Sequence, residues 1–320
     1  MSVVLCGSSA LDFWRSDHPI AQSQPKKSSL RKLPNSIDTS LPAIQQAREI
    51  CGIGQRPLHI MVLKASSRRR IQNVEFHVRS QPFPSGSLVR IDDNVFVASP
   101  EMCFVQVAAE GVFPITAIAG VEFCGYYAAA PKLESGMRPR RPLTSSRLLL
   151  SYCDRAAGQP GVKNARKALS YIVDFSASPK ETGLMLLLCL PGLTGGYGLP
   201  LPLLNHRIDV GKHVRKVSNK NYYRCDLFWP EPSLAIEYDS NFAHTGSADI
   251  ANDSKRRNAL EEMGVHVMSV TWEQAKNPNE CEKIARIVAR RLGKPLRNHS
   301  YDVAERRYEL RRYLLGTHGL

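Results

Sequence analysis

The sequence has no long run of hydrophobic residues. Its longest uninterrupted run, Leu184 to Leu190, is far shorter than the roughly 20 apolar residues that a transmembrane helix needs. The first residues, MSVVLCGSSALDFW, carry no basic segment and reach Asp12 before an apolar segment of adequate length forms. We therefore expect no membrane span, no signal peptide and a cytoplasmic protein.

The sequence also has no cysteine pair of the kind that binds zinc. None of the eight cysteines belongs to a CxxC pair, and most lie among apolar residues, as in "LCLP" and "EFCGY". This pattern is typical of buried, reduced thiols rather than of zinc ligands or of the disulfide framework of a secreted protein. We expect every cysteine to be a free thiol.

Acidic residues are scarce relative to basic ones. The 43 Lys and Arg against 29 Asp and Glu give a net charge of +14 and a pI near 9.5. Such an excess favours a polyanionic partner, with nucleic acid as the first candidate. A basic solvated surface without such a partner is the alternative. The positions that we expect to contact nucleic acid are Arg68, Arg69, Arg70, Lys255, Arg256 and Arg257.

With 320 residues, the chain is long enough for two domains. We expect the first, an α+β domain, over residues 1–150, with basic, exposed linkers at 21–43 and 131–142. Its strongest signals are two strand pairs and one helix. The expected elements are strands at 57–63 and 74–80 joined by a basic hairpin loop at 64–70, a hairpin over 87–99, and a helix that Ser99 caps.

The second domain, over residues 151–320, has a clear order of elements. Ser178, Pro179 and Glu181 are typical of a helix start. From there the patterns predict a helix, three strands, a second helix, a fourth strand and a closing helix, followed by a basic helix over 302–315. This order predicts an α/β domain in which helices flank a mixed sheet.

Three acids interrupt two of these strands in the stretch "CDLFWPEPSLAIEYDS". Side chains alternate along a strand, so Glu237 and Asp239 should face the same side. The short Pro-Glu-Pro connection makes the preceding strand, which carries Asp226, an antiparallel neighbour. Three carboxylates at one sheet face suit Mg²⁺ or Mn²⁺, which would orient a phosphodiester and activate water. The alternative is that Asp226 and Asp239 are strand-end residues that face solvent.

These residues resemble a known family of nucleases. The stretches "SPKETGLML", "YRCDLFWPEPSLAIEYDS" and "DSKRRNALEEMGVHVMSVTW" resemble the PD-(D/E)XK endonucleases, in the branch related to very-short-patch-repair enzymes. The resemblance implies a restriction-endonuclease-like fold and places metal ligands at Asp226 and Glu237, joined by Asp239. It also assigns catalytic roles to Glu181, an acid of the opening helix, and to His244, near the reaction centre. Without the resemblance, Glu181 is equally a helix-capping acid and His244 a solvated loop residue.

The sequence departs from the family pattern at two positions. Asp239 stands where the family has lysine, although this branch commonly has Asp there, and Ser240 stands where glycine usually follows. Metal alone, or a cation from the next helix, would then replace the lysine. The candidates for that cation are Lys255, Arg256 and Arg257.

The first half of the chain resembles another family. The stretch "LHIMVLKASSRRR…VEFHVRS…LVRIDDNVFVASPEMCFVQVA" resembles the sensor-like region of AbiEi-type antitoxins. Two functions of different classes follow from the two resemblances: a Mg²⁺-dependent DNA endonuclease, or a catalytically silent regulator that binds nucleic acid. The partners compatible with them are DNA, a second copy of the chain in a homo-oligomer, or a toxin.

Overall fold

The computed structural model describes residues 2–54, 56–211, 214, 220–239, 247–296 and 301–315, with the backbone alone for 239, 247–253 and 301. The chain divides into two compact units, Met1–Ile172 (unit 1) and Val173–Leu320 (unit 2). Helices α5 (Ser146–Arg155) and α6 (Val162–Leu169) belong to unit 1, so this division lies later than the expected boundary at residue 150. None of the described helices combines the length and the apolar character that crossing a membrane requires.

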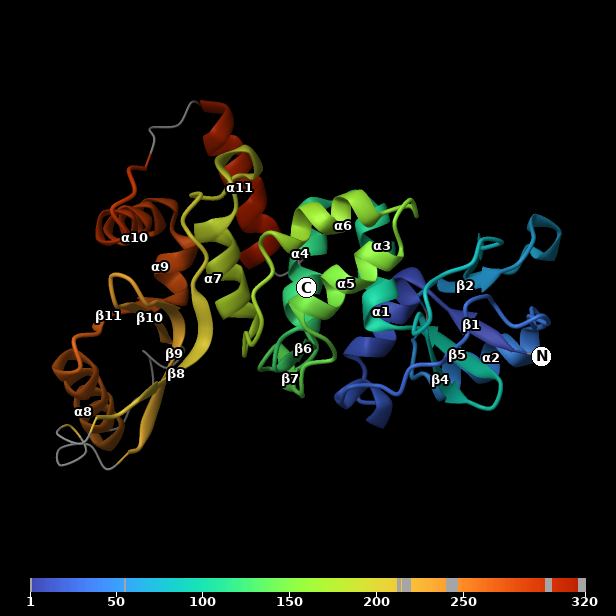
Figure 1. Cartoon of the computed structure of the whole chain (residues 1–320), viewed down its shortest axis with the longest axis horizontal. Helices are drawn as coiled ribbons and strands as arrows, with labels where there is room; N and C mark the ends of the chain where they lie inside the picture. Colours follow the sequence, from blue (N-terminus) through green and yellow to red (C-terminus); the bar gives the residue numbers. More distant parts are fainter. Residues whose placement is uncertain are drawn as a thin grey trace. The chain divides into compact units, whose positions relative to one another are not determined.

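Unit 1 is built on a five-stranded mixed sheet in the order β3-β2-β1-β5-β4 (Figure 1). The parallel pairing of β1 with β5 and the antiparallel pairing of β1 with β2 place the N-terminal strand at its centre. Large buried side chains such as Trp14, Phe104 and Tyr152 form the core around it. The strands are β1 (Val3–Leu5), β2 (Leu58–Val62), β3 (Val74–Val78), β4 (Leu88–Asp92) and β5 (Val95–Ala98).

Helices and a small hairpin complete unit 1. Ser99 caps α3 as expected, because its Oγ accepts a hydrogen bond from the backbone N–H of Met102 (3.3 Å). The expected hairpin over 87–99 is present as the antiparallel pair β4 and β5. The remaining elements are α1 (Gly7–Arg15), η1 (Pro19–Gln22), α2 (Leu41–Ile50), η2 (Ala65–Ser67), α3 (Pro100–Ala109), α4 (Phe113–Phe123), β6 (Tyr127–Ala129) and β7 (Met137–Pro139).

The expected hairpin between residues 57 and 80 was wrong. Strands β2 and β3 pair in parallel, with His59 opposite Glu75 and Met61 opposite His77. The connection between them is a crossover that includes η2 and returns through Asn73, whose φ is +58°. A connection of this length is close to the dozen or so residues that a parallel crossover needs, whereas a hairpin would use far fewer.

The two segments expected to be exposed linkers are partly built into unit 1. In the first, Leu33 is buried, and the Nζ of Lys27 lies 2.6 Å from a carboxylate oxygen of buried Glu101. In the second, β7 forms and Arg140 is buried. Proline and serine content predicted irregular backbone here, but irregular backbone can still pack against a core.

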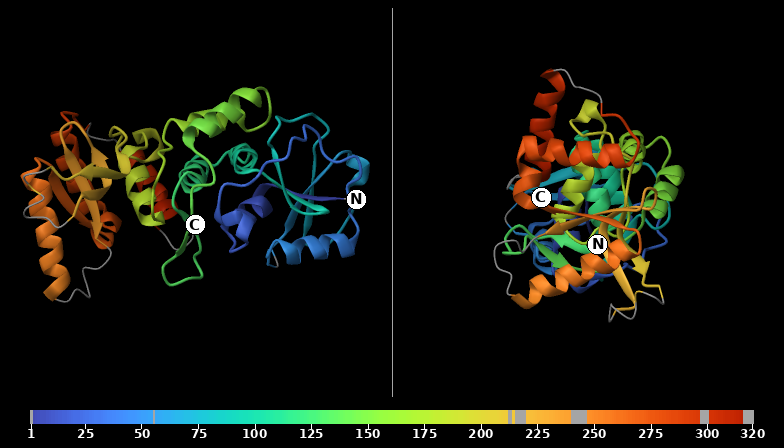
Figure 2. Two further views of the ribbon diagram at one scale, coloured as in Figure 1. Left: turned by 60° about the horizontal axis from the view of Figure 1, so that its bottom comes forward. Right: turned by 90° about the vertical axis from the view of Figure 1, so that its left-hand side faces the viewer.

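Unit 2 has the predicted α/β order, to which the structure adds two short helices, η3 (Gly192–Thr194) and α9 (Trp272–Lys276). Its four-stranded mixed sheet has the order β11-β10-β9-β8. Strand β9 is antiparallel to β8 and β10, and β10 is parallel to β11. In Figure 2 (left) this sheet lies between α8 and the pair formed by α7 and α11. The elements are α7 (Pro179–Cys189), η3 (Gly192–Thr194), β8 (Leu203–Asp209), β9 (Tyr222–Trp229), β10 (Leu234–Asp239), α8 (Ser247–Glu262), β11 (His266–Thr271), α9 (Trp272–Lys276), α10 (Pro278–Arg291) and α11 (Tyr301–Leu315).

Helix α7 is buried on every side from Glu181 to its end. All residues from Glu181 to Cys189 are buried, which is typical of a helix enclosed by other elements. A Cβ at Gly183 would lie 2.9 Å from the carbonyl oxygen of Leu314, so α7 and α11 approach backbone to backbone there. This packing anchors the first turn of α7, and therefore Glu181, beside the sheet.

Candidate functional site

The sheet of unit 2 is irregular where β8 carries Asn205 and β9 carries Asp226. The pairs Leu204↔Leu227 and His206↔Cys225 flank these two residues. Asn205 has a φ of +47°, a left-handed conformation that asparagine tolerates better than most residues. Its side-chain N–H₂ group is thereby free to bond outside the ladder. It donates to the carbonyl of Phe175 (3.0 Å) and to Oε2 of Glu181 (2.8 Å).

Asp226 interrupts the pairing of β9 with β10. The described register ends at Ile236↔Leu227, and beyond it the backbone N–H of Tyr238 donates to Oδ2 of Asp226 (2.7 Å). Burial raises the pKa of Asp226, while the Tyr238 N–H and the charge of Arg256 act in the opposite direction. The carboxylate of Asp226 thus accepts a hydrogen bond that a backbone carbonyl of the neighbouring strand would normally accept.

Glu181 reaches the same region from α7. Its carboxylate accepts hydrogen bonds from the backbone N–H of Ala177 (2.9 Å), the hydroxyl of Ser178 (3.0 Å) and the side chain of Asn205. Every one of these donors is neutral. Burial, and then the charge of Asp226, raises the pKa of Glu181 to about 7. A carboxyl group with this pKa exchanges a proton readily at neutral pH, as a general acid or base must.

Glu237, on β10, forms an ion pair with α8. Arg256 Nη2 donates to Oε1 (2.7 Å) and lies 2.6 Å from Oε2 of this carboxylate. The same nitrogen donates to the carbonyl of Arg224. Burial raises the pKa of Glu237, the charge of Arg256 opposes the rise, and the charge of Asp226 adds to it. Arg256 is therefore the cation that supports the acidic cluster.

The three carboxylates form one electrostatic cluster with Asp226 at its centre. The charge of Asp226 raises the pKa values of both Glu181 and Glu237. Their oxygen atoms are nevertheless not close enough together to share one metal ion. Among the described side chains, three potential ligand atoms lie within 4.8 Å of one another only in a different group, formed by His59, Glu75 and His77. A metal ion shared by the acids would require them to move closer.

The other predicted site residues have mixed outcomes. The backbone of Asp239 is at the end of β10, but its side chain lies outside the described residues, and so does the whole of His244. The predicted metal site of Asp226, Glu237 and Asp239 therefore stays a prediction. Arg257 donates to the hydroxyl of Ser269 (3.2 Å). The remaining predicted nucleic-acid contacts, Lys255, Arg68, Arg69 and Arg70, are exposed.

Sequence reasoning missed Asn205 as a member of the site. It lies in "LLNHRIDV", and a polar residue within such a strand carries no distinctive signal. It did not predict the ion pair of Glu237, and it left the cation that would replace the missing lysine open among three basic residues of the next helix. Helical periodicity does not distinguish Lys255, Arg256 and Arg257, because the choice depends on how α8 packs against the sheet.

Two aromatic side chains near the site attract cations. The rings of Tyr238 and Trp272 are edge-to-face, with centroids 6.3 Å apart. The Nζ of Lys180, the residue before Glu181, lies 5.8 Å and 5.3 Å from the two ring centres, and Lys276 lies 5.5 Å from that of Trp272. Each contact is within cation–π range. They place two positive charges around one aromatic pair.

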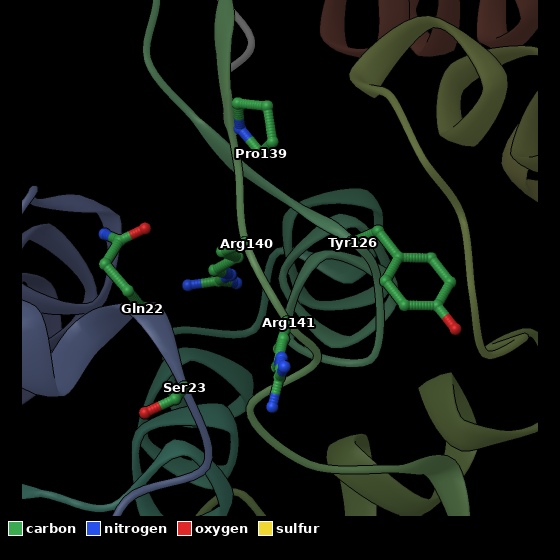
Figure 3. Close-up of a pocket in the computed structure, with 6 residues that line it drawn as sticks. All are labelled: Gln22, Ser23, Tyr126, Pro139, Arg140 and Arg141. Carbon is green, nitrogen blue, oxygen red and sulfur yellow. The ribbon is translucent and has the colours of Figure 1, made fainter.

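Unit 1 has a pocket of its own, lined by residues that include Gln22, Arg140 and Arg141 (Figure 3). The guanidinium of Arg140 donates to the carbonyls of Trp14 (2.5 Å) and Glu122 (2.9 Å). Because these bonds tie Arg140 into the fold, this pocket offers less available chemistry than the acidic cluster of unit 2.

Comparison with known proteins adds little about function. No family model matches the chain, and no solved structure matches it significantly. Two curated proteins of Mycobacterium tuberculosis, MT2308 and Rv2248, are each 27% identical to it over 135 residues, 42% of this chain. Both are described as uncharacterized, and the match spans 44% of each, so the chain covers less than half the length of these relatives.

Proposed function

We propose that this protein is a metal-dependent nuclease that hydrolyses phosphodiester bonds in DNA at the cluster of Glu181, Asp226 and Glu237. The observation that carries the proposal is the incompletely neutralised acid cluster: Glu181 is buried beside Asp226, has only neutral hydrogen-bond donors, and has a pKa near 7. Buried acids without a compensating cation cost stability, and such groups are concentrated at functional sites.

The chemistry of the donors fits Mg²⁺ or Mn²⁺. Asp226 and Glu237 offer hard carboxylate oxygens, the ligand type that these ions prefer, and Asp239 follows on the same strand. A bound ion would supply charge stabilisation to the phosphodiester and lower the pKa of a water molecule. Glu181 would receive the proton from that water and later give it to the leaving oxygen of the cleaved phosphodiester. His244 would assist this proton transfer.

Arg256 takes the place of the missing lysine in this proposal. Its Nη2 pairs with Glu237, while its Nε is buried and has no hydrogen-bond partner among the described residues. Leaving a buried charged donor unpaired is costly, and an oxygen of a DNA phosphate would satisfy it. Arg256 would thus orient the substrate and release Glu237 to the metal.

A second function is supported by the same ion pair. Because Arg256 already compensates Glu237, the site also fits a silent nuclease fold in a regulator of antitoxin type. Such a regulator would bind nucleic acid through exposed basic residues, Arg68, Arg69 and Arg70 among them. A toxin or a second copy of the chain would be its protein partner.

Asp226→Asn tests the choice between the two. The amide oxygen can still accept the bond from Tyr238, so we expect a folded protein. Plasmid and single-stranded DNA would be incubated with Mg²⁺, Mn²⁺ or EDTA. We expect cleavage that EDTA abolishes and that Asp226→Asn lowers on the order of 100-fold or more. Asp209→Asn is the matched control, because Asp209 is an exposed acid of the same sheet, ion-paired with Arg207 at 2.7 Å.

The outcomes separate the two functions. Equal cleavage by wild type and Asp226→Asn would mean that a contaminant or another site is responsible. Salt-sensitive DNA binding without cleavage under any metal condition would overturn the nuclease and support the regulator.

A further inference from the structure

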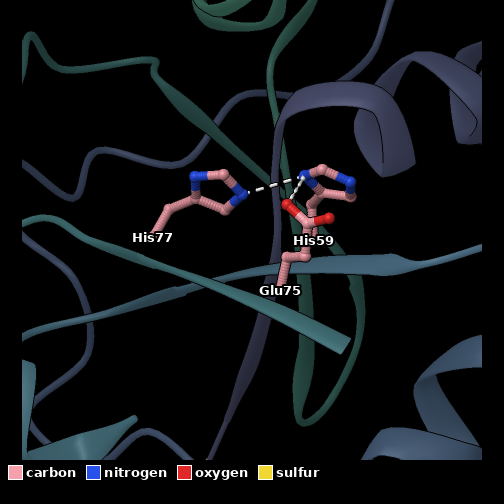
Figure 4. A group of neighbouring side chains, drawn as sticks. All are labelled: His59, Glu75 and His77. Atoms are coloured by element: carbon pink, nitrogen blue, oxygen red, sulfur yellow. Dashed lines mark hydrogen bonds and ion pairs between the residues drawn. The ribbon is translucent and has the colours of Figure 1, made fainter. Parts of the chain in front are cut away.

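A second group of potential ligands lies in unit 1, far along the sequence from the acidic cluster. The side chains are His59 on β2 and Glu75 and His77 on β3 (Figure 4). His59 pairs with Glu75 across the parallel strands, and His77 follows Glu75 by two residues. Side chains two residues apart on a strand share a face, so all three project from one face of the sheet.

The three ligand atoms are already close together. His59 Nδ1 lies 2.8 Å from His77 Nε2 and 3.8 Å from Oε2 of Glu75, and all three atoms lie within 4.8 Å of one another. In a tetrahedral zinc site, bonds of 2.0–2.1 Å place neighbouring ligand atoms about 3.3 Å apart. The separations of 2.8 Å and 3.8 Å lie on either side of this value, so small side-chain rotations would bring the three atoms to the spacing of a zinc site.

The backbone holds the inner ligand in place. The N–H of His59 donates to the hydroxyl of Ser9 (2.8 Å), and its carbonyl accepts from the N–H of Cys6 (3.0 Å). A Cβ at Gly7 would lie 3.6 Å from His59 Nδ1, so the first turn of α1 closes the inner side of the group. By contrast, Glu75 and His77 lie on the edge strand and are exposed. The group is rigid on one side and open to solvent on the other.

We propose that His59, Glu75 and His77 form an open binding site for one divalent transition-metal ion, with Zn²⁺ as the representative ion. Two imidazoles and one carboxylate are a donor set of three-ligand zinc sites, which leave a position for water or another ligand. The carboxylates of unit 2, in contrast, are oxygen donors that suit Mg²⁺. This inference does not depend on the proposed nuclease activity.

Binding requires a shift of one hydrogen atom. The contact between His59 Nδ1 and His77 Nε2 needs a hydrogen on one of these nitrogens. For both lone pairs to bind a metal, that hydrogen moves to the other nitrogen of its own ring, so the imidazole stays neutral and no proton is lost.

Few described groups would compete for the ion. All eight cysteines are free and buried, so their thiols are inaccessible to added metal. His266 on β11 resembles the group in one respect, because its Nδ1 lies 3.9 Å from Oε2 of Glu261. It is not part of a three-ligand group among the described side chains, which makes it a matched control.

The test is a titration of untagged, EDTA-treated protein with Co²⁺ in excess Mg²⁺, followed by visible absorption, and then displacement by Zn²⁺. We expect one equivalent of Co²⁺ with the absorption of nitrogen-ligated cobalt. Removing a ligand costs at least as much affinity as removing its supporting group, so His77→Ala and Glu75→Gln should each weaken binding about 100-fold or more. His266→Ala should bind like wild type.

Two results would overturn the proposal. One is no binding of Co²⁺ or Zn²⁺ at micromolar concentrations. The other is binding that His77→Ala and Glu75→Gln leave unchanged. Melting in EDTA should be alike for wild type and both variants, because both side chains are exposed on an edge strand. Lower affinity in variants that melt like wild type would therefore report the loss of a ligand and not of the fold.

Discussion

Both units of the chain bury glutamate side chains, and Glu122 of unit 1 and Glu181 of unit 2 behave in opposite ways. In unit 1, Glu122 is fully buried. Burial raises its pKa, but Arg15, which contacts both carboxylate oxygens at 2.6 to 3.1 Å, acts together with the charge of Arg140 and the backbone N–H of Ala129, and the net shift is downward. In unit 2, Glu181 has three neutral donors and a neighbouring acid, and its pKa rises to about 7. Both acids are buried, so burial does not explain why their pKa values shift in opposite directions. The difference is that a cation contacts Glu122 and none contacts Glu181 among the hydrogen bonds described for it.

The difference indicates what each acid does. The carboxylate of Glu122 forms an ion pair with Arg15, which joins α4 to α1 and keeps the carboxylate charged. A buried carboxyl without a cation is unfavourable for the fold, and such groups are concentrated at functional sites. By this criterion, Glu181 and not Glu122 is the acid that we propose for chemistry. The following experiments test that contrast, beginning with the largest expected effect on free energy.

Arg15→Met should cause the largest loss of stability. It leaves the charge of Glu122 buried without its ion-pair partner, and breaking a buried pair in this way costs about 3–5 kcal/mol of unfolding free energy. Chemical denaturation measures the loss. Arg90→Met, which removes the exposed pair with Asp93, should cost about 1 kcal/mol or less. Equal losses in the two variants would contradict the view of Glu122 as a structural ion pair.

Glu181→Gln should change the pH dependence of stability. Between about pH 4.5 and 7, folded Glu181 keeps a proton that the unfolded chain has released, so the unfolding free energy falls as the pH rises. Removing this titration should reduce that fall by up to about 3 kcal/mol. The measurement is denaturation at a series of pH values across this window.

Glu122→Gln provides the contrasting variant. The pKa of Glu122 is lowered, so its titration lies below this window. We expect a less stable protein whose pH slope between about 4.5 and 7 matches that of wild type. A slope that responds to Glu122→Gln and not to Glu181→Gln would reverse the assignment of the two acids.

Arg256→Gln should strengthen metal binding at the acidic cluster. Arg256 and the metal compete for Glu237. A partly exposed ion pair contributes at most about 1 kcal/mol, so removing it should raise the metal affinity by at most about fivefold. The increase of melting temperature with Mg²⁺ or Mn²⁺ reports this affinity. Arg257→Gln is the control, since Arg257 bonds to Ser269. If Arg256 also orients the phosphate, cleavage should fall while metal binding rises. Weaker metal binding in Arg256→Gln would contradict the competition.

The smallest effects concern DNA binding by single exposed arginines. Arg69 of unit 1 and Arg257 of unit 2 are both exposed. If each contacts one phosphate, Arg69→Ser and Arg257→Ser should each reduce the slope of log affinity against log salt by about 1. Binding measured over a range of salt concentrations would show whether both units or only one of them hold the DNA. An unchanged slope in both variants would remove these two arginines from the interface.

Local signals in the sequence were sufficient for much of unit 2. Ser178 and Glu181 predicted the start of α7, where the backbone N–H of Glu181 donates to Ser178 Oγ (3.1 Å). The Pro-Glu-Pro connection predicted that β9 and β10 are antiparallel. Caps, turns and periodicity act within a few residues of sequence, so they can be read without knowing the rest of the fold.

The same signals were insufficient for the shape of the site. Alternation predicted that Glu237 and Asp239 share a face, but no local signal predicted the hydrogen bond from the backbone N–H of Tyr238 to the carboxylate of Asp226. The sequence also carried no local signal for the left-handed backbone of Asn205, or for the pairing of Arg256 rather than Lys255 or Arg257 with Glu237. Each depends on contacts between elements that are distant in sequence.

The sequence alone determined the order of elements in unit 2, the free and buried cysteines and the acids available for chemistry. The tertiary structure decided which acids received a cation: Arg15 joined Glu122, Arg256 joined Glu237, and Glu181 received neutral donors. It also turned an expected hairpin into the parallel pair that sets His59 opposite Glu75. Secondary structure follows from local conformational preference, whereas the pKa of a buried group and the neighbours of a strand follow from long-range packing, which no short stretch of sequence contains.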